Sequence, residues 1–195
     1  CDMEGIGNRD TRISQFRKCW IQGSEATVVG VWGAGTSKEL TANWSSPFEG
    51  ESIGNKIPLA GGMAQAATDM TTVTTLNSRQ TWEGNRPTTF NIELKLYALE
   101  DPESEVMQPI RALEFMAAPD VNDMQPAGGR IPDRVCVNIG TRHIFTDMVI
   151  DSISQPFDKE IDSQGRFVRA TLNIQLSTLT MISKDMLRKG YGQQA

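Results

Sequence analysis

Groups that commonly catalyse reactions are scarce in this chain of 195 residues, which has one histidine and three cysteines. The histidine, His143, stands in an expected turn. A general base needs a partner group and a cleft, and neither can be argued for His143 from the sequence, so we interpret it as a solvated residue. The sequence therefore predicts no catalytic residues, and we expect the protein not to be an enzyme.

The cysteines Cys1, Cys19 and Cys136 are far apart, and no C-x-x-C spacing occurs. This absence argues against a zinc site and a redox motif, so no metal ligands and no cofactor-binding residues are predicted. Cys136 lies in an apolar run and is interpreted as a small strand residue. Two states of the cysteines remain open, which are free thiols throughout or one disulfide, within the chain or to a neighbouring molecule.

Long apolar runs are also lacking, because no stretch approaches the roughly 20 apolar residues that a membrane-spanning helix needs. The first residues have neither a basic region nor an apolar core, so we expect no signal peptide there. The first residue is not Met, which leaves the natural start of the product open.

The net charge of -5 and the scattered Lys and Arg residues argue against a nucleic-acid-binding surface. The densest basic group is Lys184, Arg188 and Lys189, which we interpret as a solvated tail or a protein contact rather than a phosphate site.

Two segments superficially resemble ligand-binding loops. The glycine-rich residues 30–35 lack both the Lys-Ser/Thr ending of a P-loop and the G-x-G-x-x-G spacing, so a turn is predicted instead. Acidic residues gather near the end of the chain, but they do not have the spacing of a calcium-binding EF-hand loop. These acidic residues are Asp147, Asp151, Asp158, Glu160 and Asp162, and we interpret residues 158–165 as an acidic turn between strands.

Residues 1–86 are rich in Gly, Thr and Ser and carry long loops. Strands are predicted at residues 26–31 and 70–76, and residues 57–67 are either a partner-facing arm or a loop packed on its own domain. The weak patterning of residues 68–81 suits a strand covered by another subunit. The tryptophans are dispersed, which favours packing over sugar stacking; they are Trp20, Trp32, Trp44 and Trp82.

Residues 87–180 are more regular. Phe90 to Leu96 alternate between apolar and polar side chains, which predicts a half-buried strand. A helix should start at Asp101 with Pro102 at its first position, and Pro109 either kinks it or marks its true start. Its apolar stripe is predicted at Val106, Ile110, Leu113 and Met116 or Ala117. Strands are predicted at residues 135–139 and 144–153, joined by a tight turn. Residues 166–179 form a long strand whose buried face is Val168, Ala170, Leu172, Ile174 and Leu176. Its polar face is Arg169, Thr171, Asn173, Gln175 and Ser177.

The order of these segments resembles a known structural family. The segments are residues 89–96, the acidic-started helix with residues 109–113, residues 135–140, residues 145–154 and residues 162–172. This order is similar to that of the tube-initiator or tube–baseplate adaptor proteins of contractile phage tails and related injection systems. Many such proteins carry a C-terminal LysM module, for which residues 181–195, interpreted as a tail, leave no room.

The resemblance implies a mainly β (α+β) fold, a tail-tube-like antiparallel β-barrel or sandwich with one flanking helix and an extended N-terminal arm or hairpin. It implies a structural virion protein, made in the host cytoplasm, whose homo-oligomeric ring joins the tail tube to the baseplate hub. A hexamer is expected, with a trimer as the alternative, and DNA would only pass through a polar channel. The polar face from Arg169 to Ser177 is then a candidate channel or subunit surface. Alternatives are a tail tube or tail terminator protein, or a small-ligand or carbohydrate-binding β-domain.

Overall fold

The structure is a computed structural model, and it describes residues 4–45, 80–120, 131–157 and 160–192. It is mainly β, with 45% strand and 18% helix, as the sequence predicted. Contacts divide the chain into two units, which are Cys1–Leu40 with Pro87–Ala195, and Thr41–Arg86. We describe each unit by itself. The predicted strand at 70–76 and the segment 57–67 lie outside the described residues.

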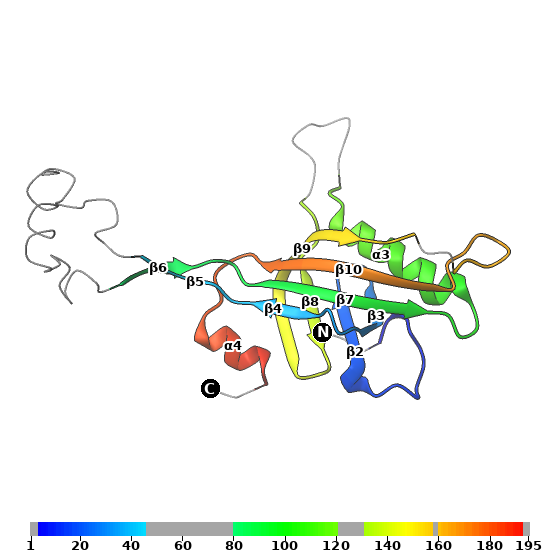
Figure 1. The fold of residues 1–195 in the computed structure, drawn as a ribbon, viewed down its shortest axis with the longest axis horizontal. Helices are drawn as coiled ribbons and strands as arrows, with labels where there is room; N and C mark the ends of the chain where they lie inside the picture. Colours follow the sequence, from blue (N-terminus) through cyan, green and yellow to red (C-terminus); the bar gives the residue numbers. More distant parts are fainter. Residues whose placement is uncertain (1–3, 46–79, 121–130, 158–159, 193–195) are drawn as a thin grey trace, which may run out of the picture. The chain divides into compact units, whose positions relative to one another are not determined.

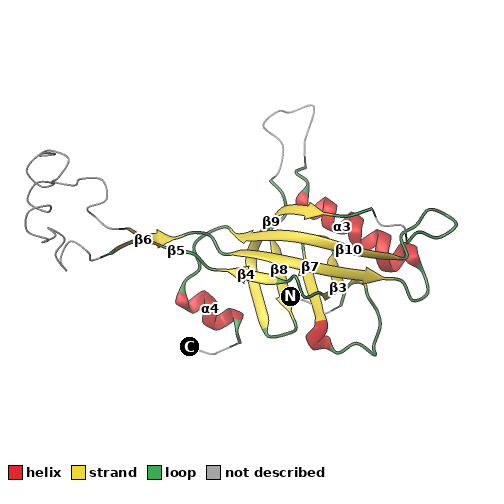
Figure 2. Ribbon diagram, viewed as in Figure 1, coloured by secondary structure: helices red, strands yellow, loops and turns green. Residues whose placement is uncertain are grey.

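The larger unit is built on a closed antiparallel barrel of six strands (Figures 1 and 2). The barrel order is β3-β2-β8-β9-β10-β7, and a further pairing of β7 with β3 closes it. Two short strands extend the sheet beyond this ring, since β1 pairs parallel to β3 and β4 pairs antiparallel to β7. The strands are β1 Ile6–Gly7, β2 Lys18–Gln22, β3 Thr27–Trp32, β4 Ser37–Glu39, β7 Thr89–Tyr97, β8 Val135–Ile139, β9 His143–Ser154 and β10 Arg169–Thr178.

The core of the barrel follows the alternation of β7 and β10. Leu172 pairs with Leu94, and their neighbours two residues away on each strand also face inward. The predicted buried residues of β10 are confirmed at Ala170, Leu172, Ile174 and Leu176, each at most 3% exposed. The prediction was wrong for Val168, which is 37% exposed. Strand β10 begins at Arg169, not at 166, because Asp162 accepts hydrogen bonds from the backbone and side chain of Arg166 and holds that residue in a turn.

The predicted helix begins with a π-helical segment, η2 Glu103–Met107, and continues as α3 Gln108–Ala117. Pro109 is therefore near the start of the regular α-helix, where its missing N–H costs little. The expected apolar stripe is confirmed, because Val106, Ile110, Leu113 and Met116 are all buried. Glu105 is buried too, and its carboxylate accepts hydrogen bonds from the backbone N–H groups of Leu99, Glu100 and Asp101.

The first 45 residues contain more strands than the one or two predicted for the N-terminal half, although the predicted strand at 26–31 is confirmed as β3. Three consecutive residues of β2, Cys19, Trp20 and Ile21, are buried, so the outward side chain is covered as well. Burial on both faces removes the alternation by which a strand is recognised. A 3₁₀ turn, η1 Gln15–Arg17, precedes β2 and is capped by Ser14.

Two further predictions concern the ends of strands. The tight turn after β8 is confirmed, with Gly140 and Thr141 both at positive φ, of 61° and 62°. One flanking helix was predicted, but the structure has two. Residues 181–195, interpreted as a tail, contain α4 Lys184–Gly190, which Ser183 caps by accepting a hydrogen bond from the N–H of Met186. None of the helices in the described ranges has the length and apolar character needed to span a bilayer.

The smaller unit contains a two-stranded antiparallel sheet of β5 Ala42–Ser45 and β6 Thr81–Asn85. Trp44 lies directly opposite Trp82, and a bulge follows, where Gly84 has a φ of 126°. The Trp82 indole N–H donates to Asn85, and Ser45 hydrogen-bonds Glu83. The two tryptophans are 57% and 49% exposed.

Candidate assembly surfaces

The residues considered for chemistry are not brought together by the fold. Within the described ranges no group of three or more His, Cys, Asp or Glu side chains could hold a metal ion. Asp162 is tied to Arg166, whose backbone and side-chain hydrogen bonds lower the carboxyl pKa below its usual value. Asp151 accepts a hydrogen bond from Ser177, and Asp147 lies 3.9 Å from Arg134. Asp158 lies outside the described residues, and Glu160 pairs with Arg169.

Of the glycine-rich residues 30–35, residues 30–32 belong to β3, and the turn that was predicted is formed by the residues after Trp32. This turn is wrapped around a carboxylate of its own chain. Gly35 N–H donates a 2.6 Å hydrogen bond to Glu93, and Gly33 N–H donates to the Glu93 carbonyl. A Cβ on Gly33 would stand 2.4 Å from the Glu93 carboxyl carbon, so any other residue at this position would displace the carboxylate. The Gly35 hydrogen bond, followed by Lys95, lowers the pKa of Glu93. The backbone donor that a phosphate would need is therefore already occupied.

The cysteines differ from one another in state. Cys19 is a free thiol with no exposed surface, and burial raises its pKa to about 12. Cys136 is disulfide-bonded, so of the two states left open by the sequence the structure has the one with a disulfide. Cys1 lies outside the described residues.

Aromatic and basic side chains gather at one end of the barrel, around the turn between β8 and β9. Lys38 Nζ lies 5.0 Å from the centre of the Phe145 ring and 4.9 Å from that of Tyr191, and it donates a 2.7 Å hydrogen bond to Tyr191 Oη. His143 packs edge-on against Tyr191, with ring centres 5.2 Å apart. Two arginines stack nearby, Arg17 on Trp32 and Arg142 on Phe16. We call these residues, with Lys184, Arg188 and Lys189 of α4, the basic–aromatic surface.

A cavity of about 300 Å³ opens within this surface. Its floor includes the buried rings of Phe90 and Phe145, and its rim carries Lys38, His143 and Tyr191. Helix α4 is held there by close packing, since a Cβ on Gly190 would lie 2.8 Å from the Phe145 ring. The pKa of His143 is lowered below 6.5, mainly by burial and secondly by the nearby Lys38 ammonium. His143 was predicted to lie in a turn and be solvated; it is exposed, as the first residue of β9, and it contacts Tyr191.

The opposite charge gathers beside α3. A groove of about 280 Å³ is lined by apolar residues such as Ala112 and Met116, and Phe115 and Ile131 stand beside it at 75% and 73% exposure. Carboxylates surround these apolar residues, and none of them forms an ion pair within the described ranges. We call this set the acidic α3 surface; it is Glu25, Phe115, Asp120, Ile131 and Asp133.

The polar face of β10, expected to line a channel or a subunit contact, is continuous with β7 and β9. Asn173 pairs with Glu93 on one side and Ser154 on the other, and Gln175 pairs with Asn91 and Ser152. A shallow pocket of about 140 Å³ lies over these residues. Amide and hydroxyl groups dominate this part of the sheet, where the carboxylate of Glu93 is matched by Lys95 at 3.1 Å.

The four tryptophans fall into two classes. Trp20 is 3% exposed and Trp32 is half-buried under Arg17, which confirms packing positions for both. Trp44 and Trp82 form the exposed cross-strand pair of the smaller unit, and sequence reasoning missed their pairing because the two residues are 38 positions apart.

Comparison of the chain with protein-family models and with curated proteins found no match.

Proposed function

We propose that the protein is a structural subunit of a contractile phage tail, forming a homo-oligomeric ring between the tail tube and the baseplate hub. The order of elements that resembles tube-initiator and tube–baseplate adaptor proteins motivates this proposal. A closed six-stranded antiparallel barrel with α3 alongside is compatible with a tube-like subunit. A hexamer is the expected state, with a trimer as the alternative.

The observation that carries the proposal is the exposed tryptophan pair of β5 and β6. A two-stranded sheet on its own is marginally stable in water, and needs further strands or a packed face. Trp44 and Trp82 offer a large apolar surface on one face of such a sheet. A neighbouring subunit would cover the pair and complete the sheet, which is the role that the resemblance gives to an extended hairpin. The polar face of β7, β10 and β9 would then line the channel or meet a neighbour.

The test is whether the purified full chain assembles, and assembly is measured by light scattering and negative-stain microscopy. We expect closed rings, and the double variant Trp44→Ser/Trp82→Ser should stay monomeric with an intact barrel by circular dichroism. Leu99→Ser is the matched control, because Leu99 is 46% exposed but lies on the larger unit. A wild-type protein that stays monomeric at high concentration would overturn the proposal.

The same tryptophan pair supports a second candidate, a carbohydrate-binding β-domain, since exposed indole rings stack on sugars. That function predicts a monomer whose tryptophan fluorescence changes on titration with glycans. Loss of the change in Trp44→Ser/Trp82→Ser, without any assembly of the wild type, would favour this candidate over the ring.

A further inference from the structure

We propose that the acidic α3 surface of one copy docks onto the basic–aromatic surface of a second copy. The inference rests on the proposed assembly of identical subunits, and it names one contact of that assembly. Both surfaces belong to the larger unit, so their placement on one body is defined. The occupant of the cavity beside Lys38 would be the Phe115 side chain of the neighbouring copy.

Charge is the first argument. The chain has a net charge of -5, yet the basic–aromatic surface carries six cations, Arg17, Lys38, Arg142, Lys184, Arg188 and Lys189, and the acids next to them in the chain are Glu39 and Asp185. Asp185 is already paired with Arg188. The acidic α3 surface carries carboxylates without a cation partner in the described ranges. Surfaces of opposite potential steer copies together in one orientation, and like surfaces repel.

Exposed apolar surface is the second argument. Phe115 is 75% exposed in the middle of the acidic surface, and an aromatic ring this exposed among charges is a common anchor of protein interfaces. Across the molecule, the cavity of about 300 Å³ has an apolar floor and a cationic rim. A ring entering the cavity would be desolvated there, and the carboxylates that line the groove beside Phe115 would approach the cations around the cavity.

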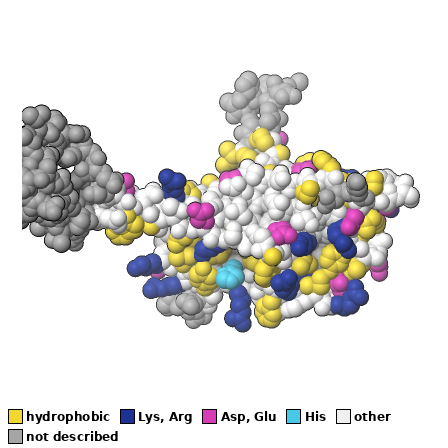
Figure 3. Space-filling model, in the orientation of Figure 1, with side chains coloured by type: hydrophobic (Ala, Val, Ile, Leu, Met, Phe, Trp, Pro, Cys, Tyr) yellow, Lys and Arg dark blue, Asp and Glu magenta, His cyan; other side chains and the backbone are white. Residues whose placement is uncertain are grey.

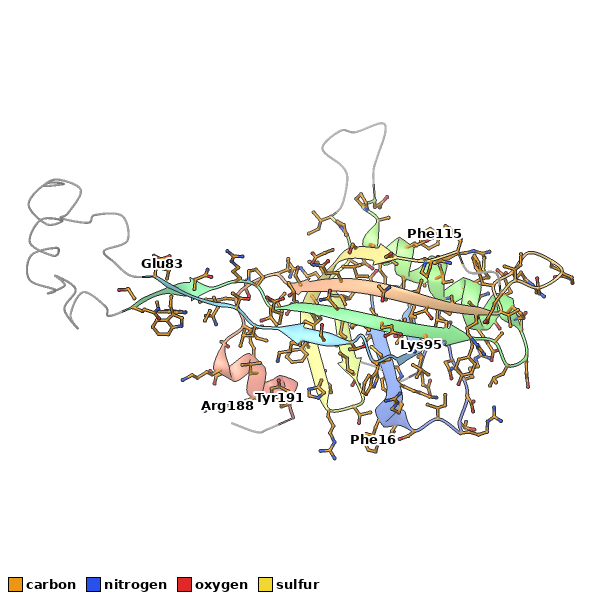
Figure 4. The ribbon with its side chains drawn as sticks, viewed as in Figure 1. Phe16, Glu83, Lys95, Phe115, Arg188 and Tyr191 are labelled. Carbon is orange, nitrogen blue, oxygen red and sulfur yellow. The ribbon has the colours of Figure 1, made fainter. Side chains whose placement is uncertain are left out.

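Placement is the third argument. Phe115 lies on the opposite side of the barrel from Phe16, Arg188 and Tyr191 (Figure 4). In the view of Figure 3, most Lys and Arg side chains and the single histidine lie in the lower half of the molecule, with some Asp and Glu side chains among them. Two different surfaces on opposite sides give a head-to-tail contact, which produces a ring if the rotation closes and an open chain if it does not. A symmetric pair, by contrast, would bring like charges together.

The nucleic-acid alternative is less well supported at this surface. One face of the Trp32 ring and one face of the Phe16 ring are already occupied by Arg17 and Arg142, which leaves less ring surface for stacking on bases. The guanidinium groups held over these rings remain able to pair with carboxylates at their edges. We therefore assign the surface to an acidic protein partner, and specifically to a second copy.

The experiment uses two exposed substitutions in the full chain. Phe115→Ala removes the anchor and Arg142→Glu reverses a charge on the receiving surface, and sedimentation measures association across concentration and salt. We expect each variant to associate at least tenfold more weakly than the wild type, and wild-type association to weaken as salt rises. Phe157→Ala is the matched control, because Phe157 is 82% exposed outside both surfaces and should leave association unchanged.

Mixing the two variants gives the sharpest result. Phe115→Ala keeps an intact basic–aromatic surface and Arg142→Glu keeps an intact acidic α3 surface, so an equimolar mixture should associate more tightly than either variant alone. Unchanged association of both variants, or a mixture that stays monomeric, would overturn the inference. If wild type and both variants all form closed rings, the result supports the proposed function and contradicts this contact. If wild type forms open chains that Phe115→Ala abolishes, the contact stands and the ring falls.

Discussion

Lys38 Nζ donates a 2.7 Å hydrogen bond to Tyr191 Oη, although the two residues are 153 positions apart in the chain. The bond joins the edge strand β4 to the end of the C-terminal helix α4 at the rim of the cavity beside Phe145. Three aromatic rings, those of Phe90, Phe145 and Tyr191, lie within 6 Å of the same ammonium. Helix α4 is thus part of the barrel end, and its attachment can be tested.

The first prediction concerns the fit of Gly190, the last residue of α4, against the Phe145 ring. Gly190→Ala should weaken the docking of α4, because the new Cβ would meet the Phe145 ring at 2.8 Å and the Ile144 carbonyl oxygen at 2.9 Å. Hydrogen exchange of α4 amides should accelerate while the barrel strands stay protected. Tyr191→Phe removes only the hydroxyl group. It should lower the free energy of unfolding in urea by at most about 0.5–1.5 kcal/mol, because the hydrogen bond is exposed. Equal exchange in wild type and Gly190→Ala would contradict this packing.

The second prediction concerns the titration of His143. Its pKa should lie below 6.5, because burial and then the Lys38 ammonium disfavour the imidazolium. The protein has one histidine, so a single NMR signal reports it. Lys38→Met should raise this pKa, but not fully to 6.5, since burial is the larger cause. Folded stability should fall as the pH drops below 6.5, because the unfolded chain binds the proton more readily. His143→Gln should lose that part of the pH dependence.

The third prediction concerns Asp10, which accepts hydrogen bonds from the Arg12 side chain and backbone and from Tyr97. The Arg12 side-chain hydrogen bonds are the main reason that the pKa falls from 3.8 to about 2. Because the pKa is depressed, Asp10 contributes stability above pH 3.8, and this contribution is lost as the pH falls toward 2. Asp10→Asn should therefore be less stable than wild type at pH 6, with the difference shrinking in acid. Urea unfolding measures this difference in stability. The control is Glu100→Gln, at an exposed acid, whose stability difference from wild type should not shrink in acid.

The fourth prediction concerns Glu105, a 5%-exposed carboxylate that accepts three backbone N–H groups where β7 leads into η2. Glu105→Ala leaves those donors without their partner, and a buried unsatisfied donor costs about 1–3 kcal/mol. Glu105→Gln keeps one acceptor oxygen and should lose less. Urea unfolding gives the difference in free energy. If Glu105→Ala were as stable as wild type, water would have replaced the carboxylate and the buried position would be in doubt.

Local periodicity was enough to predict the regular half of the molecule. Strand β7, the apolar stripe of α3 and the inward residues of β10 all follow from side-chain spacing, because a strand or helix with one covered face repeats that face in the sequence. It failed where the burial is two-sided, as at Cys19, Trp20 and Ile21 of β2. It also missed α4, a helix of seven residues whose position depends on a close approach of Gly190 to Phe145.

What the sequence by itself determined is the mainly β class and the faces of individual strands, since these depend on residues a few positions apart. It could not determine the surfaces. Lys and Arg residues that looked scattered, such as Arg17, Lys38 and Arg142, meet at one barrel end because strand pairing and barrel closure bring distant segments together. The carboxylates around Phe115 separate from them for the same reason. Only the tertiary structure decides which charges share a surface, because that depends on the register between strands.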